Sequence, residues 1–245
     1  MQQLLVLFFF SLGVVGLVVS GQVLFMQNFE GPTPAPPQLP AGWTTTQTPS
    51  LTVVGWKVVD KAHLWGESAQ ILAFPSGTRA LYFGRVDPTT GKGSYEEGPK
   101  AVSGTVITPA ISLSNAKYIR ISFYYLRIVE EYTGGHYDET IVEYSWDGDT
   151  WNSLWWKSSK DPKDSTWKKW VSEPIEVSQK VSTMRLRFIF NSKDGQSNNF
   201  LGWLIDDLVV ERVPPPLTVE LRQGGSPQVS VTSVVATVGQ SLPDY

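Results

Sequence analysis

Residues 137–156 read YDETIVEYSWDGDTWNSLWW, and this stretch decides the fold class of the 245-residue chain. Two runs of β-branched and aromatic residues flank Asp-Gly-Asp at 147–149, and Gly148 can adopt the positive φ that tight turns require. In the first run Val142 and Tyr144 alternate with a mixed set of residues, the two-residue period of a strand. The stretch therefore predicts a β-hairpin, and it carries no nucleophile, base or metal-ligand cluster.

The two-residue period recurs on both sides of the hairpin. Large apolar residues occupy every second position from Ile119 to Tyr125 and again from Met184 to Phe190. Other short apolar or strand-like runs, bounded by glycine and proline, are residues 23–29, 56–60, 71–74, 79–83, 104–114, 167–177 and 201–212. No segment has a helical apolar stripe of ten residues. The chain is therefore predicted to be all-β, a two-sheet antiparallel jelly-roll (concanavalin-like) sandwich with a short β-prone C-terminal tail.

The N-terminus predicts export. Residues 4–19 are almost entirely apolar, and Ser20-Gly21 supply the small residues of a cleavage site, so residues 1–21 are predicted to be a signal peptide. The alternative is a retained membrane anchor that continues through Met26. The strongly apolar run is shorter than the ~20 residues of a typical membrane span, which favours cleavage. Both interpretations predict an extracellular or cell-surface location, with membrane contact only if the segment is retained.

Charge and cysteine content narrow the functional classes. The net charge is -3 and no lysine or arginine stripe occurs, which argues against a nucleic-acid partner. The chain has no cysteine, so an exported domain must rely on its core, on a bound metal, or on both. Secreted animal modules are more often cross-linked, so a bacterial or archaeal surface protein is favoured.

A proline-rich segment separates the predicted sandwich, residues 22–212, from residues 213–245. The 29 residues that follow Pro216 cannot bury a core of their own. Residues 228–238 carry no charge and alternate like a strand, a composition prone to edge pairing. They are predicted to pair with the edge of their own sandwich, with another subunit or with a downstream domain. The stiff prolines favour the last two, and pairing with another subunit would be self-assembly through the tail.

Eight short motifs occur in the order found in extracellular jelly-roll modules. They span residues 28–31, 39–43, 80–84, 106–114, 121–125, 138–151, 185–188 and 202–208. On these motifs the chain resembles the MAM domain and, more closely, the bacterial cleaved-adhesin type. The cysteines of animal MAM domains are missing, which favours the bacterial branch. The resemblance implies a jelly roll with adhesive, substrate-binding or anchoring roles and no chemistry of its own.

Three acidic residues are candidates for a charged site in or beside packed strands. Glu30 ends the first predicted strand of the sandwich, and Asp206-Asp207 lie inside the last one. Neighbours in a strand point to opposite faces, so at least one aspartate should face packed surface. A buried carboxylate needs a cation, N–H donors or an arginine, for which Arg185 and Arg187 are candidates.

Calcium is the cofactor that the resemblance implies. Relatives of this module hold structural calcium near the first and last strands, which Glu30, Asp206 and Asp207 would match. Asp60 is a further candidate ligand. Calcium takes six to eight oxygen ligands and suits loops that join strand ends.

Tryptophans crowd the hairpin and the loop after it. Trp155 and Trp156 are adjacent, so they cannot both enter the same core face. An exposed tryptophan can stack on a sugar or anchor a protein partner, so Trp155, Trp156 and Trp167 are candidate ligand-binding residues. The alternative is that all of them pack in the core or at its rim.

Catalysis has little support in the sequence. Neither a Gly-x-Ser-x-Gly nor a His-Glu-x-x-His motif occurs. Glu139 and Glu143 share a strand face but lie roughly 13 Å apart, wider than glycosidase acid pairs. The predicted function is a non-catalytic secreted or cell-surface module for adhesion, recognition or assembly, with a glycan or a surface protein as partner. The alternatives are a carbohydrate-binding module that serves a secreted hydrolase and an enzyme with another acid pair.

Overall fold

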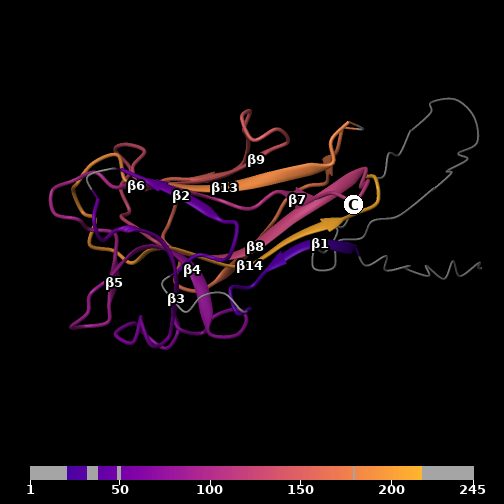
Figure 1. The fold of residues 1–245 in the computed structure, drawn as a ribbon. Coiled ribbons are helices and arrows are strands. Elements are labelled where there is room, and N and C mark those ends of the chain that lie inside the picture. Colours follow the sequence, from indigo (N-terminus) through magenta and orange to yellow (C-terminus); the bar gives the residue numbers. More distant parts are fainter. Residues whose placement is uncertain (1–20, 32–37, 49–50, 179, 217–245) are drawn as a thin grey trace, which may run out of the picture.

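A computed structural model describes residues 21–31, 38–48, 51–178 and 180–216, and these residues form two antiparallel sheets packed face to face (Figure 1). The first sheet has the order β11 (Lys168–Val171), β8 (Tyr118–Ile128), β14 (Gly202–Arg212), β4 (Arg79–Val86) and β3 (Gly55–Asp60). Three short strands extend it: β1 (Gln22–Gln27) on β14, β12 (Ile175–Glu176) on β8, and β5 (Gly93–Ser94) on β4.

The second sheet has the order β10 (Asn152–Lys157), β9 (Glu139–Ser145), β13 (Thr183–Asn191), β6 (Ser103–Ile107) and β2 (Thr44–Gln47), and β7 (Ile111–Ser112) also pairs with β13. The chain crosses repeatedly from one sheet to the other, as in a jelly roll. The predicted fold class, an all-β two-sheet antiparallel sandwich, is confirmed.

The alternation in the sequence builds the core between the sheets. Ile121 and Phe123 of β8 are fully buried and face the fully buried Phe188 of β13, with 5.7 Å between the Phe123 and Phe188 ring centroids. Trp203 of β14 is also fully buried among these rings. Burial of large aromatic side chains is the main source of stability in such a core.

The predicted hairpin is formed by β9 and β10. Gly148 has a φ of 91° in the turn between them. The Asp147 carboxylate accepts N–H bonds from Thr150 at 2.8 Å and from Asp149 at 2.9 Å, and these bonds hold its pKa well below the usual range. The side chain of Asp147 therefore fixes the turn that Gly148 permits.

Residues 71–74 do not form the predicted strand. They lie in the connection between β3 and β4, where Phe74 packs with Leu64 and Leu204 in a second apolar cluster. The cluster covers part of the outer face of the first sheet, so the apolar run is buried by packing over a sheet and not by pairing within one.

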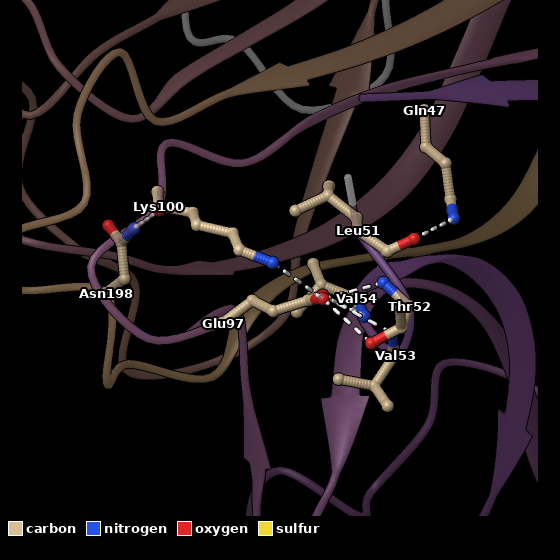
Figure 2. Close-up of polar contacts among 8 residues, drawn as sticks. All are labelled: Gln47, Leu51, Thr52, Val53, Val54, Glu97, Lys100 and Asn198. Atoms are coloured by element: carbon tan, nitrogen blue, oxygen red, sulfur yellow. Dashed lines mark hydrogen bonds and ion pairs between the residues drawn. The ribbon is translucent and has the colours of Figure 1, made fainter. Parts of the chain in front are cut away.

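A buried carboxylate ties two loops together (Figure 2). Glu97, in the loop between β5 and β6, accepts N–H bonds from Thr52 at 2.6 Å, Val54 at 3.0 Å and Val53 at 3.3 Å, with the Thr52 hydroxyl at 3.0 Å. Burial alone would raise the pKa of Glu97, but these donors outweigh it and lower the pKa to about 2. The contact anchors residues 51–54, which lead into β3.

The part of the chain that the structure describes contains no helix of the length and apolarity needed to cross a membrane. The apolar residues 1–20, most of the predicted signal peptide, and residues 217–245 of the tail lie outside the described residues.

Candidate functional site

Glu30 lies at the turn that leads into β4. Its carboxylate accepts the N–H of Thr78 at 2.7 Å, the Thr78 hydroxyl at 3.2 Å, and the N–H of Arg79. Three donors from one turn thus hold the carboxylate beside the start of β4.

Asp206 and Asp207 reach the same turn. Ser76 donates its hydroxyl to Asp207 at 2.6 Å and its N–H to Asp206 at 3.5 Å. The pairing of β14 with β8 shifts register between Asp206 and Val209, and Asp207 has a φ of 46°. Such a bulge re-aims side chains, so both carboxylates contact Ser76. Asp206 is fully buried, as expected for at least one of the two aspartates, but alternation did not predict that both carboxylates would reach the same serine.

The environment of Asp206 is short of positive charge. Asp206 is fully buried, and burial is the main reason that its pKa is raised to about 8. The negative charges of Asp207 and Glu30 raise the pKa further, whereas the N–H bonds from Asp207 and Ser76 lower it. Among ion pairs between described residues, none involves any of the three carboxylates. Arg185 and Arg187, the arginines predicted as possible partners of these acids, bond to other groups. Arg187 donates to Glu143, and Arg185 donates to the carbonyl of Thr108.

The oxygen atoms of Glu30, Asp206, Asp207 and Ser76 suit calcium, since carboxylates and hydroxyls are the hard oxygen ligands that the ion prefers. The arrangement is not that of a formed site. Within the described ranges, no group of three or more His, Asp or Glu side chains surrounds a common metal position. Binding would require Glu30 and Asp207 to exchange hydrogen bonds with the turn for bonds to the ion.

Asp60 is not part of this cluster. Its Oδ1 accepts the N–H of His63 at 2.9 Å and lies 2.7 Å from the His63 ring Nδ1. Burial would raise the pKa of Asp60, but the bonds from His63 lower it. The carboxylate is thus already engaged at the end of β3.

Two of the three candidate ligand-binding tryptophans are structural. Trp155 is buried and stacks on Trp203, with ring centroids 5.5 Å apart and planes at 20°. Trp167 is half-buried, donates its indole N–H to the carbonyl of Ile71 at 3.1 Å, and packs on Phe74. Ligand binding by Trp155 is therefore a wrong prediction, because its ring is enclosed by the core. Trp156 points outward and is 44% exposed.

Trp156 belongs to a group of aromatic rings that we call the aromatic surface: Tyr132, His136, Tyr137 and Trp156. The His136 and Trp156 rings are 5.1 Å apart, and the Tyr132 and Tyr137 rings are 5.7 Å apart. Tyr132, which is 47% exposed, lines an open cavity of about 220 Å³ together with Glu131, Thr133, Ser159, Lys160, Asp161 and Pro162. Of the four rings, Tyr132 is the one that lines this cavity.

The loops that carry this surface are bonded to each other. Ser159 donates its N–H to the carbonyl of Tyr137 at 2.7 Å, and Tyr132 donates its N–H to the carbonyl of Ser159 at 2.9 Å. Beneath them the fully buried Arg127 donates to the carbonyls of Ser158 and Asp161. The cavity wall is therefore pre-organised, which lowers the entropic cost of binding. Tyr132 and Arg127 were not predicted as site residues. The local sequence gives no signal for them apart from Gly134-Gly135, which indicates a loop near Tyr132.

Asp138 supports the same region from within. It is buried, and its carboxyl accepts the Tyr95 hydroxyl at 2.7 Å and the N–H of Glu130 at 3.2 Å. Burial raises its pKa from an ordinary 3.8 to about 7, and the Glu130 charge adds to the rise while the Tyr95 bond opposes it.

Because the folded pKa is raised, Asp138 contributes stability that is fully present below pH ~4 and is lost as the pH rises through about 7. We expect Asp138→Asn to reduce the fall in unfolding free energy between pH 5 and pH 8 by on the order of 2 kcal/mol. Urea denaturation at both pH values measures this difference. Asp149→Asn, in the exposed hairpin turn, is the control. An identical pH dependence in wild type and Asp138→Asn would contradict the assignment.

Glu139 and Glu143, the two acids that share a strand face, are each paired with a cation. Glu139 bonds to Lys193 at 2.6 Å, and the nearby Glu131 bonds to Lys163 at 3.2 Å. Glu143 bonds to Arg187. These three carboxylates are therefore each engaged in an ion pair.

Trp65 is the most exposed tryptophan in the described part of the chain, at 57%, and it is not among the ligand-binding residues predicted from the sequence. Its indole ring lies on Gly91, where an added Cβ would come within 2.5 Å of the ring. Trp65 belongs to the loop after β3, so it gives a matched control for the aromatic surface.

Comparisons with known proteins show similarity in fold alone. No family model and no curated protein matches the sequence. The structure is similar to the K1 cleaved adhesin domain of Lys-gingipain from Porphyromonas gingivalis W83, at 17% identity and a TM-score of 0.49, over 78% of this chain and 98% of that one. It is also similar to a cyclase from Fischerella sp. TAU, at 15% identity and a TM-score of 0.46, over 77% and 95% of the two chains.

A third similar structure is the CBM22-1 xylan-binding domain of Paenibacillus barcinonensis Xyn10C, at 13% identity and a TM-score of 0.39, over 80% of this chain and 98% of that one. At such identities the likeness concerns the arrangement of strands. The predicted resemblance to the MAM domain stays a prediction. The chain is a β-sandwich similar in strand arrangement to cleaved adhesin domains and carbohydrate-binding modules.

Proposed function

We propose that this chain is a non-catalytic recognition module of a secreted or cell-surface protein and that its aromatic surface binds a glycan. The observation that carries the proposal is a group of exposed aromatic rings: Trp156 of β10 contacts His136, and Tyr132 lines an open cavity on the adjoining loop. The apolar residues 4–19 support export.

The chemistry of the aromatic surface suits a sugar. A pyranose ring has an apolar face, which stacks on an exposed aromatic ring, and hydroxyls, which need donors and acceptors at its rim. Lys160, Asp161 and Thr133 supply such polar groups at the cavity. The cavity is smaller than the ~300 Å³ at the lower end of drug-sized pockets, so we expect it to hold one ring of a longer glycan.

Removing the exposed rings should weaken binding. We expect Trp156→Ala and Tyr132→Ala each to weaken glycan binding by roughly 5- to 150-fold, since loss of a buried aromatic contact costs about 1–3 kcal/mol. A glycan array identifies the ligand, and isothermal titration measures the affinities. Trp65→Ala is the control and should bind like the wild type.

Three outcomes would contradict this proposal. Binding that survives Trp156→Ala but is lost in Trp65→Ala would place the site on the loop after β3. Binding to a surface protein without any glycan would replace the ligand class. Turnover of a polysaccharide by the purified chain would overturn the non-catalytic assignment.

We also propose that calcium is a structural cofactor held by Glu30, Asp206 and Asp207, with the Ser76 hydroxyl as a further oxygen ligand. Support comes from the meeting of three acidic side chains at the turn before β4, of which Asp206 is fully buried and has no ion pair among the described residues. A bound cation would replace the proton on Asp206, balance the charges of Glu30 and Asp207, and connect β14, the residues after β1 and the turn into one unit.

A further inference from the structure

Strand β1 has an unpaired edge. It pairs with β14 along one side, from Gln22 opposite Arg212 to Gln27 opposite Leu208, and no described strand pairs with its other side (Figure 1). Its sequence, Gln-Val-Leu-Phe-Met-Gln, has neither a charge nor a proline. Unpaired N–H and C=O groups on such an edge form a template for another strand.

The edge also exposes apolar side chains. Val23 is 54% exposed and Met26 is 61% exposed. The strand register places Met26 opposite Val209, Val209 opposite Ser122, and Ser122 opposite Val171, which is 45% exposed. Residues directly opposite one another in antiparallel strands share a face, so Met26 and Val209 form an apolar strip at β1, and Ser122 separates it from Val171.

The other edge strands are protected. The edge strands β3, β10 and β11 carry lysines, namely Lys57, Lys157, Lys168 and Lys169, and β2 has only hydroxyl and amide side chains. Lysine on an edge is a common device against unwanted pairing. Within the described strands, β1 combines a free edge with large exposed apolar residues and has no lysine. Its protection against unwanted pairing is a bulge at Leu24.

We propose that residues 228–238 of a second copy of this chain pair with the free edge of β1. This segment is as uncharged as β1 and alternates Val229 and Val231 with Ser230 and Thr232. It lies within the 29 residues that follow Pro216, long enough to reach a neighbouring molecule. Its valines would extend the strip beside Met26.

Strand direction favours a second copy over the same chain. Every pairing between named strands is antiparallel, so the added strand should enter beside Gln27 and leave beside Gln22. The chain leaves β14 at Arg212, beside Gln22, and the stiff Pro214–Pro216 carries it onward. The tail of the same chain would have to pass Gln27 and turn back before it could pair with β1. The tail of a second molecule whose C-terminal end faces Gln27 would already run in the required direction. The assembly is therefore head-to-tail.

The absence of cysteine allows a direct test by disulfide formation. Met26→Cys is placed in one tagged full-length copy, and single cysteines at positions 229 to 234 are placed in a second copy with a different tag. We expect disulfide-linked heterodimers at every second tail position, since strand neighbours alternate faces. Equal cross-linking at all positions would overturn strand pairing.

The same cysteines in one chain separate the alternatives. A disulfide within a monomer would show that the tail pairs with its own β1 and overturn the exchange. Light scattering gives the second measurement: full-length protein should be oligomeric, and it should become monomeric without residues 217–245 or in the double variant Val23→Lys/Met26→Lys. Val53→Lys, at an exposed position outside β1, is the control and should stay oligomeric. A full-length monomer would overturn the proposal and leave the glycan site untouched.

Discussion

Removal of calcium by a chelator should lower the melting temperature of this protein by roughly 5–10 °C. A ligand that binds only the native state stabilises it by about 2.7 kcal/mol at a hundredfold excess over Kd. For a domain of this size each kcal/mol corresponds to about 2–4 °C. The physical source is the cluster of Glu30, Asp206 and Asp207, three acidic side chains at one turn that have no ion pair among the described residues. Differential scanning calorimetry with calcium and with EGTA measures the shift.

Variants assign the effect to these carboxylates. Asp207→Ala and Glu30→Gln should remove most of the response to calcium, because each deletes a ligand charge. Asp60→Asn is the matched control: its carboxylate is engaged with His63, so the response should remain. A melting temperature that is the same with calcium and with EGTA would show that the hydrogen bonds from the turn are enough to hold the cluster.

Glu97→Ala should destabilise the fold by about 3 kcal/mol, because it leaves three backbone N–H groups without their acceptor. These groups belong to Thr52, Val53 and Val54, which lead into β3. Glu97→Gln should cost a similar amount, since its amide places a donor among donors. Urea denaturation measures the loss, and Glu96→Ala, at the exposed neighbouring residue, should stay within about 0.5 kcal/mol of the wild type.

The pH dependence follows from the lowered pKa of Glu97. A carboxyl whose folded pKa is depressed contributes stability above its unfolded pKa of 4.5 and loses it as the pH falls through about 2. Wild type should therefore lose stability over this range relative to Glu97→Ala. Parallel curves for the two proteins between pH 5 and pH 2 would mean that the carboxylate charge contributes nothing.

Alternation was enough to predict most of the sandwich. The buried positions of β8 and β13 are those with the two-residue period, because side chains in a strand point to opposite faces. The same rule required that one of Trp155 and Trp156 face outward, without saying which. The choice depends on register: Trp155 pairs with the inward-facing Val142, and Trp156 pairs with Ile141.

The rule failed where the backbone departs from a regular strand. The bulge in β14 brings Asp206 and Asp207 to the same residue, and alternation cannot anticipate a bulge. The apolar run 71–74 likewise has no local feature that separates a strand from a segment packed over a sheet.

The sequence by itself determined the fold class and the hairpin turn, and it indicated that Asp206 or Asp207 would face packed surface. These depend on local properties: the period of apolar residues, a glycine at a positive φ, and the alternation of side chains along a strand. Only the tertiary structure decided which aromatic rings are exposed, and it alone placed Glu97 on the N–H groups of residues 52–54 and Arg127 under residues 158–161. Those contacts join residues more than thirty positions apart, and their partners are chosen by sheet packing, which no local pattern records.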